Sequence, residues 1–137
     1  MVGVVVVTHG QLAAELLSAA EMIVGDLPRF AAVSIGWHED TNDAREEIAQ
    51  AVAKVQHGQQ GHGVLIVTDM FGGTSSNLAM TFLGPHVEVI TGVNLPMLIK
   101  LASLQEQASL LEVAREMREH GRNAIWVASD LLRGEKA

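Results

Sequence analysis

The chain has 137 residues, of which 48% are hydrophobic and 18% are charged, and its net charge is −7. This balance excludes a disordered chain and is typical of one packed globular domain, which we expect to span residues 1–137. The acidic charge, without a cluster of Lys or Arg, argues against nucleic acid and anionic membranes as partners, and the lack of cysteine excludes disulfides and thiolate sites.

An apolar, β-branched run extends from Val2 to Val7 and is typical of a strand buried on both faces. The run has no basic flank of a signal peptide and is far shorter than the roughly 20 residues of a membrane helix, so we expect a cytoplasmic protein. A helix is predicted from Gln11 to Val24, ending before Gly25. Its apolar stripe is formed by Leu12, Leu16, Ala20 and Ile23.

Strands and helices continue to alternate along the rest of the chain, with strands predicted from short apolar runs and helices from helical spacing of apolar residues. The next strands are expected at Phe30 to Ile35, Val64 to Val67 and Val87 to Thr91. Helices are expected at about Asp43 to His57, about Ser76 to Phe82, from Pro96 onward, and from Leu110 to an end at His120 and Gly121. Ala124 to Ala128 is predicted as a fifth strand, followed by a short tail at 129–137.

This alternation predicts an α/β fold, because parallel strands joined by helices form a sheet that is covered on both faces. Right-handed connections place the helices in two outer layers, which gives a three-layer sandwich. The simplest arrangement is a flavodoxin-like sheet with strand order 2-1-3-4.

Two loops with unusual residues follow neighbouring strands of this sheet, at the carboxyl ends where open α/β sheets bind ligands. His9 follows the first strand, and its neutral imidazole is a good nucleophile near neutral pH. Asp69 follows the third strand and is expected to hold the other ring nitrogen as N–H, at roughly 2.6–3.2 Å. Asp69 would also stabilise positive charge on the ring.

A glycine turn completes the predicted site. Gly72, Gly73 and Thr74 lie before a helix, where backbone N–H groups bind anions without any cation. We therefore assign phosphoryl binding to a segment that consists of Phe71, Gly72, Gly73 and Thr74. No cofactor is expected, and no metal site, because no His-x-His or His-Glu-x-x-His pairing occurs.

The other five histidines are interpreted as structural or merely exposed, with one exception. His38 follows the end of the second strand and is a candidate for the border of the site. The residues interpreted as structural lie in turns or at helix ends, and are His57, His62, His86 and His120.

Four motifs resemble the IIA domain of the mannose-family bacterial sugar phosphotransferase system (PTS), in the expected order and over nearly the whole chain. They are residues 8–10 (Thr-His-Gly), 20–25 (Ala-Glu-Met-Ile-Val-Gly), 69–74 (Asp-Met-Phe-Gly-Gly-Thr) and 92–97 (Gly-Val-Asn-Leu-Pro-Met). The resemblance implies that His9 accepts a phosphoryl group from the phosphocarrier HPr and donates it to a IIB protein during sugar uptake. It also implies that Asp69 orients His9. The chain would then be a phosphotransferase component with an indirect link to a membrane permease.

The resemblance further implies a fifth, antiparallel strand, exchanged between the subunits of a homodimer, which would be Ala124 to Ala128. Two departures are visible. Relatives often have Pro where this chain has Ser75, and Pro would stiffen the entry to the helix. In addition, no IIB domain follows, so the acceptor is expected to be another chain.

Four alternative functions compete with this hypothesis. One is a regulatory module in which the phosphorylation state of His9 controls a partner, and another is a phosphotransfer subunit of dihydroxyacetone kinase, which would need an HPr-like continuation. A flavodoxin-like cofactor binder is disfavoured because the first loop lacks a phosphate loop rich in Ser and Thr. A response-regulator receiver is disfavoured because no acidic pair ends the first strand.

Overall fold

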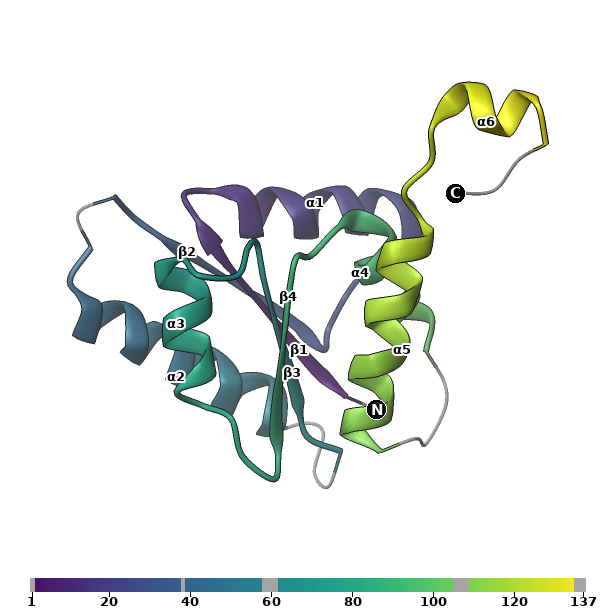
Figure 1. Cartoon of the computed structure of the whole chain (residues 1–137). Coiled ribbons are helices and arrows are strands. Elements are labelled where there is room, and N and C mark those ends of the chain that lie inside the picture. The colour runs from purple at the N-terminus through teal and green to yellow at the C-terminus, as the bar shows by residue number, and fades with distance from the viewer. Residues whose placement is uncertain (1, 38, 58–61, 105–108, 135–137) are drawn as a thin grey trace.

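The computed structural model describes residues 2–37, 39–57, 62–104 and 109–134, and its strands and helices alternate along the chain (Figure 1). The strands are β1 (Gly3–His9), β2 (Phe30–Ile35), β3 (Val64–Thr68) and β4 (Val87–Thr91). The helices are α1 (Leu12–Val24), α2 (Thr41–His57), α3 (Thr74–Met80), α4 (Leu95–Ser103), α5 (Leu110–Asn123) and α6 (Ala128–Leu132).

The four strands form one parallel sheet in the order β2-β1-β3-β4, which confirms the predicted order and the flavodoxin-like class. His9 pairs with Ile35 at the last position of β1, and Val7 pairs with Thr68 at the last position of β3. His9 and Asp69 therefore leave the sheet side by side, at its carboxyl edge.

The sheet separates two hydrophobic cores, because successive side chains of a strand point to opposite faces. Val4 and Val6 of β1 pack in the core under α1, α4 and α5, whereas Val5 and Val7 pack in the core under α2 and α3. All four valines are fully buried. The β-branched run at the start of the sequence is thus the centre of a three-layer structure, and it holds His9 at a fixed place.

The observed helices differ from the predicted ones at several points. In α1, Leu16 packs against the core and Ala20 is buried, but Leu12 and Ile23 are exposed, so the predicted apolar stripe is wrong at both ends. Helix α3 begins at Thr74, two residues before the predicted Ser76. Helix α5 continues through Gly121 to Asn123 instead of ending at Gly121.

Gly121 lies within α5, where it packs closely against α4, rather than at the end of the helix. A Cβ atom at Gly121 would lie 2.9 Å from the terminal methyl carbon of Met97 in α4. The Gly121 carbonyl accepts a hydrogen bond from the side-chain amide of Asn94, 3.0 Å away. The Asn94 oxygen accepts from the Met97 N–H at 3.1 Å and so caps α4. One Asn side chain therefore joins the start of α4 to the last turn of α5.

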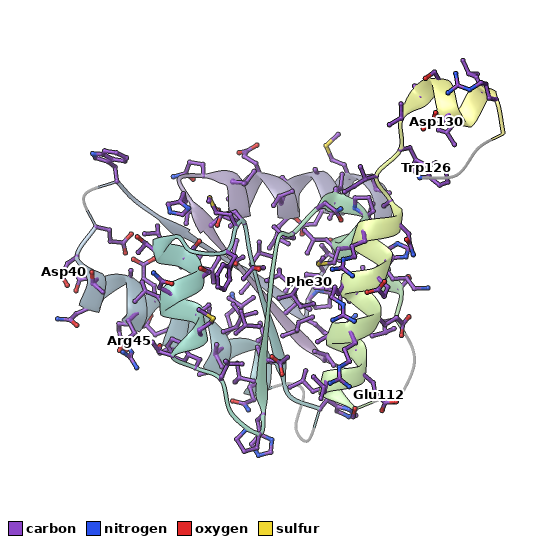
Figure 2. All side chains as sticks on the ribbon, viewed as in Figure 1. Phe30, Asp40, Arg45, Glu112, Trp126 and Asp130 are labelled. Carbon is purple, nitrogen blue, oxygen red and sulfur yellow. The ribbon has the colours of Figure 1, made fainter. Side chains whose placement is uncertain are left out.

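The predicted fifth strand at Ala124–Ala128 does not form within the single described chain, and its exchange between subunits stays a prediction. Residues 125–127 have no regular structure, and Ala128 already begins α6. Their apolar side chains are exposed, by 66% for Ile125 and 57% for Val127. Figure 2 shows Trp126 and Asp130 on the segment that projects from the end of α5. A β-strand needs a neighbouring strand for its backbone hydrogen bonds, and this segment has none within the described residues.

The same described ranges contain no helix that is long and apolar enough to span a bilayer.

Candidate functional site

The loop after β1 places His9 at the surface while its backbone stays anchored. The buried Thr8 hydroxyl accepts a hydrogen bond from the Ala13 N–H at 2.7 Å, so it satisfies a free donor in the first turn of α1. The Gly10 N–H donates to the Ile35 carbonyl at 2.9 Å, which ties the loop to β2. The His9 side chain is 48% exposed between these two anchors. A rigid backbone thus presents an accessible imidazole.

Asp69 contacts His9 twice through one carboxylate oxygen. Oδ2 lies 2.7 Å from His9 Nδ1 and accepts a hydrogen bond from the His9 backbone N–H at 3.0 Å. The Asp69 side chain is only 14% exposed. The contact predicted from the sequence is therefore present, and the distance lies in the range that orientation of a ring requires.

The second oxygen of Asp69 has its own two donors. Oδ1 accepts from the Ser75 hydroxyl at 2.5 Å and from the Met70 N–H at 3.0 Å. Burial of the carboxyl group would raise the pKa of Asp69, but the hydrogen bonds from Ser75 and then from His9 outweigh it and lower this pKa to about 2. Asp69 is consequently an anion throughout the neutral range.

The charge of Asp69 decides which nitrogen of a neutral His9 ring carries the proton. An ionised carboxylate can only accept hydrogen bonds, so Nδ1 of a neutral His9 ring must carry the proton. The other nitrogen, Nε2, then has a free lone pair, on a side chain that is about half exposed. The pair is therefore a nucleophilic nitrogen whose ring is held in position by an acid.

The glycine turn lies against this free nitrogen. A Cβ atom built on Gly73 would lie 2.8 Å from Cε1 and 3.3 Å from Nε2 of His9, so only glycine lets the backbone approach the ring this closely. Gly72 has a φ of +90°, in the left-handed region. Its N–H donates to the Ser76 hydroxyl at 2.9 Å, which in turn donates to the Gly73 carbonyl at 3.1 Å.

The predicted phosphate-binding residues are therefore not equivalent. The Gly72 N–H is already bonded within the turn, and the Phe71 side chain is exposed at the surface. Gly73 lies next to the ring, and Thr74 lines the pocket in front of it. Sequence reasoning missed both serines after Thr74, since alternation and helical spacing do not indicate which hydroxyl will meet a carboxylate.

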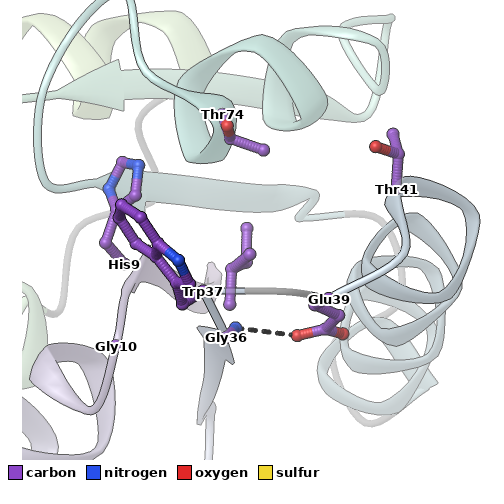
Figure 3. Close-up of a pocket in the computed structure, with 8 residues that line it drawn as sticks. His9, Gly10, Gly36, Trp37, Glu39, Thr41 and Thr74 are labelled. Atoms are coloured by element: carbon purple, nitrogen blue, oxygen red, sulfur yellow. Dashed lines mark hydrogen bonds between the residues drawn. The ribbon is translucent and has the colours of Figure 1, made fainter.

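A pocket of about 410 Å³ opens in front of His9. Figure 3 shows His9 at one side of the residues that line it, with Glu39 and Thr41 at the other side. The Gly36 N–H donates to the Glu39 carboxylate at 2.9 Å and so holds this wall together. The far wall thus comes from the loop between β2 and α2, which the sequence indicated only through His38.

The remaining histidines do not join the site where they can be described. His38 and the side chain of His57 lie outside the described part of the structure. His62 and His86 are exposed in turns, and His120 lies in the last turn of α5; these three do not line the pocket. Within the described ranges, no three His, Asp or Glu side chains gather in a way that could hold a metal ion.

Comparisons with known proteins agree with this geometry. The family described as "PTS system fructose IIA component" (EIIA-man) matches residues 3–118. A fructose-specific EIIA component of Bacillus subtilis is 28% identical over 134 residues, which cover 96% of this chain and 90% of that protein. The mannose-specific EIIAB component of Escherichia coli K12 is 31% identical over 127 residues, which cover 90% of this chain but 38% of that longer protein.

The similar solved structures are also PTS IIA proteins. The mannose/sorbose-specific IIA subunit from Enterococcus faecalis superposes with a TM-score of 0.80 at 28% identity, over 92% of this chain and 93% of that one. A PTS IIA protein associated with a fucose utilization operon in Streptococcus pneumoniae has a TM-score of 0.81 at 25% identity, over 95% of each chain.

Proposed function

The chain belongs to the EIIA-man family of sugar phosphotransferase-system components, and we propose that it is a phosphocarrier that works through His9. It receives a phosphoryl group from phospho-HPr and passes the group to a separate IIB protein. The observation that carries this proposal is the 2.7 Å contact between His9 Nδ1 and Asp69, which leaves Nε2 free on a side chain that is about half exposed.

The proposed transfer is a substitution at phosphorus. The lone pair of Nε2 forms the new nitrogen–phosphorus bond while the bond in the donor breaks, and the donor nitrogen keeps the electron pair. The proton on Nδ1 stays on the ring, which therefore gains a positive charge as the group arrives. The Asp69 carboxylate, ionised and in contact with that proton, stabilises the charge. The reverse sequence releases the group to the acceptor.

The turn after Asp69 supplies the surroundings of the phosphoryl oxygens in this proposal. Gly73 admits the group because no side chain stands between the backbone and Nε2. Thr74 lines the same pocket and offers a hydroxyl. The pocket is open enough for a phosphoryl group carried on another protein to reach the ring.

The remaining expectations about the cell and the assembly are part of the same proposal. The protein would work in the cytoplasm as a homodimer, and its IIB acceptor would pass the group to a sugar permease in the membrane. The regulatory alternative differs in the last step, because a regulatory module would keep its phosphoryl group in the presence of IIB proteins.

A labelling experiment tests the proposal. Incubation with phosphoenolpyruvate, enzyme I and HPr should give an acid-labile, base-stable phosphate on the wild-type chain and none on His9→Ala. His86→Ala, which changes an exposed histidine outside the pocket, should be labelled normally. Phosphorus–nitrogen couplings in NMR should place the group on Nε2. Labelling of His9→Ala at the wild-type level would refute the assignment. Addition of candidate IIB proteins then shows whether the label moves on.

A further inference from the structure

Ser75 is buried directly beneath the reactive pair. Its side chain has no exposed surface, and its hydroxyl donates to Asp69 Oδ1 at 2.5 Å. The other oxygen of the same carboxylate makes both contacts with His9. The chain thus has a continuous series of hydrogen bonds from the start of α3, through Asp69, to the imidazole.

We propose that Ser75 is a positioning residue for phosphoryl transfer, and that its hydroxyl fixes the Asp69 carboxylate in the rotation that directs Oδ2 at His9 Nδ1. This inference rests on the proposed function of His9. It concerns a residue that makes no contact with the reacting nitrogen and acts through Asp69.

The rotation of the Asp69 carboxylate about its Cβ–Cγ bond is set mainly by hydrogen bonds, because this torsion has no sharply preferred value. The Met70 N–H holds Oδ1 from the backbone at 3.0 Å, but the Ser75 hydroxyl approaches more closely and from another element. Bulk water does not reach this hydroxyl, since Ser75 is fully buried. Loss of the hydroxyl would leave Oδ1 with the Met70 N–H as its donor and would weaken the hold on the rotation that directs Oδ2 at the ring.

The charge of the carboxylate depends on the same bond. Burial works against ionisation of Asp69, and the hydrogen bond from Ser75 is the largest of the influences that lower its pKa to about 2. A carboxylate with this support stays ionised and in place when the ring becomes positive. The role of Ser75 is thus both geometric and electrostatic.

The start of α4 shows that a helix of this chain accepts proline at its second residue. Pro96 follows Leu95, the first residue of α4, just as Ser75 follows Thr74, the first residue of α3. Proline is tolerated there because an N–H in the first turn has no partner within the helix. Ser75→Pro is therefore a variant that can keep the helix while it removes the hydroxyl.

The first test measures the Asp69 carboxyl group directly, in the unphosphorylated protein, by carbon-13 NMR titration. Ser75→Ala and Ser75→Pro should each raise the pKa of Asp69 from about 2 toward its ordinary value of 3.8. Ser103→Ala, which removes a hydroxyl at the exposed end of α4, should leave this pKa unchanged. An unchanged titration in both Ser75 variants, with folding verified by circular dichroism, would overturn the proposal.

The second test is a double-mutant cycle on the rate of labelling by phospho-HPr. Ser75→Ala should slow labelling by roughly tenfold in the wild-type background, which is the size of effect expected from one hydrogen bond to a charged group. The same change should have less than about a twofold effect on Asp69→Asn, since Ser75 acts through Asp69. Equal slowing in both backgrounds would refute that route.

The two tests separate the inference from the function on which it rests. If the wild-type chain accepts no phosphoryl group, the proposed function fails while the NMR titration still decides the contact between Ser75 and Asp69. If labelling occurs but Ser75→Ala transfers at the wild-type rate, the function stands and the positioning role is wrong.

Discussion

Two adjacent glycines form the turn before α3, and a methyl group would act differently at each. Gly73 has ordinary backbone angles, but its Cβ would lie 2.8 Å from Cε1 of the ring. Gly72 has a φ of +90°, and a Cβ there meets nothing within 4 Å. Glycine at position 72 therefore avoids backbone strain, and glycine at position 73 makes room for the imidazole.

This difference predicts opposite outcomes for two matched substitutions. Gly73→Ala should displace the ring and lower the labelling rate at least tenfold, with little loss of stability. Gly72→Ala should lower the free energy of unfolding by about 1–2 kcal/mol, the cost of a left-handed alanine, and should retain more of the labelling rate. Urea unfolding and labelling of both variants check this. A Gly73→Ala protein with normal labelling would contradict the close approach to His9.

At the residue scale, the sequence was enough to predict the contact between His9 and Asp69. Each residue follows a strand, and neighbouring parallel strands end at the same edge of the sheet. The bond from Ser75 was not predictable in this way, because α3 begins two residues earlier than its apolar spacing indicated. That shift brings Ser75 into the first turn and beneath Asp69. The identity of a hydroxyl's partner depends on such details of helix start and rotamer.

At the scale of elements, Arg29 connects parts of the chain that are far apart in sequence. Its guanidinium donates to the carbonyl of Val2 at 2.5 Å, before β1, and to the carbonyls of Leu101 and Ala102 in α4 at 3.2 and 3.5 Å. It also lies over the Phe30 ring, 5.6 Å from the centroid. Burial lowers the pKa of Arg29, but an arginine remains charged at neutral pH.

Arg45 provides a matched control, because it lies over the Phe82 ring at 5.7 Å but is exposed in α2. Arg29→Met should lower the free energy of unfolding by about 2 kcal/mol, since it removes the hydrogen bonds that the guanidinium donates to three carbonyls in a partly buried place. Arg45→Met should cost less than about 1 kcal/mol, which is typical of an exposed cation over an aromatic ring. Denaturant unfolding of the two variants measures the difference, and equal losses would show that the carbonyl contacts of Arg29 contribute nothing.

The strands were easier to predict than the ends of the helices. Short β-branched and apolar runs gave β2 and β4 with the bounds that the structure has. In α1 the exposed Leu12 and Ile23 continue the apolar spacing beyond the part that meets the core. The apolar run at residues 124–128 has the composition of a strand, but strand formation depends on a partner that the sequence does not specify.

At the scale of the whole molecule, the apolar side chains of Ile125 and Val127 are exposed on the segment that follows α5. Strand β4 is the last strand of the sheet and has a paired strand on one side. Ile125 also lines a hollow with Ile90 of β4, so this segment begins close to that edge. These features support the expectation that residues 124–128 pair with another copy of the chain.

The wild-type protein should therefore have the mass of a homodimer in light scattering. The double variant Ile125→Asp, Val127→Asp should shift the mass toward that of a single chain, because the burial of a charged side chain at an interface is unfavourable. Leu111→Asp changes an exposed apolar residue in the first turn of α5, at the other end of that helix, and should leave the mass unchanged. A wild-type mass of 14.6 kDa at micromolar concentration would contradict the prediction.

One ring nitrogen of His9 contacts Asp69, and Gly73 lies close to the other one. Any two proteins that exchange a group with this atom must therefore approach through the same opening, and they cannot be present together. The donor protein must then dissociate before the acceptor protein can bind. Such a carrier forms mutually exclusive complexes with its donor and its acceptor. An excess of either protein would inhibit binding of the other.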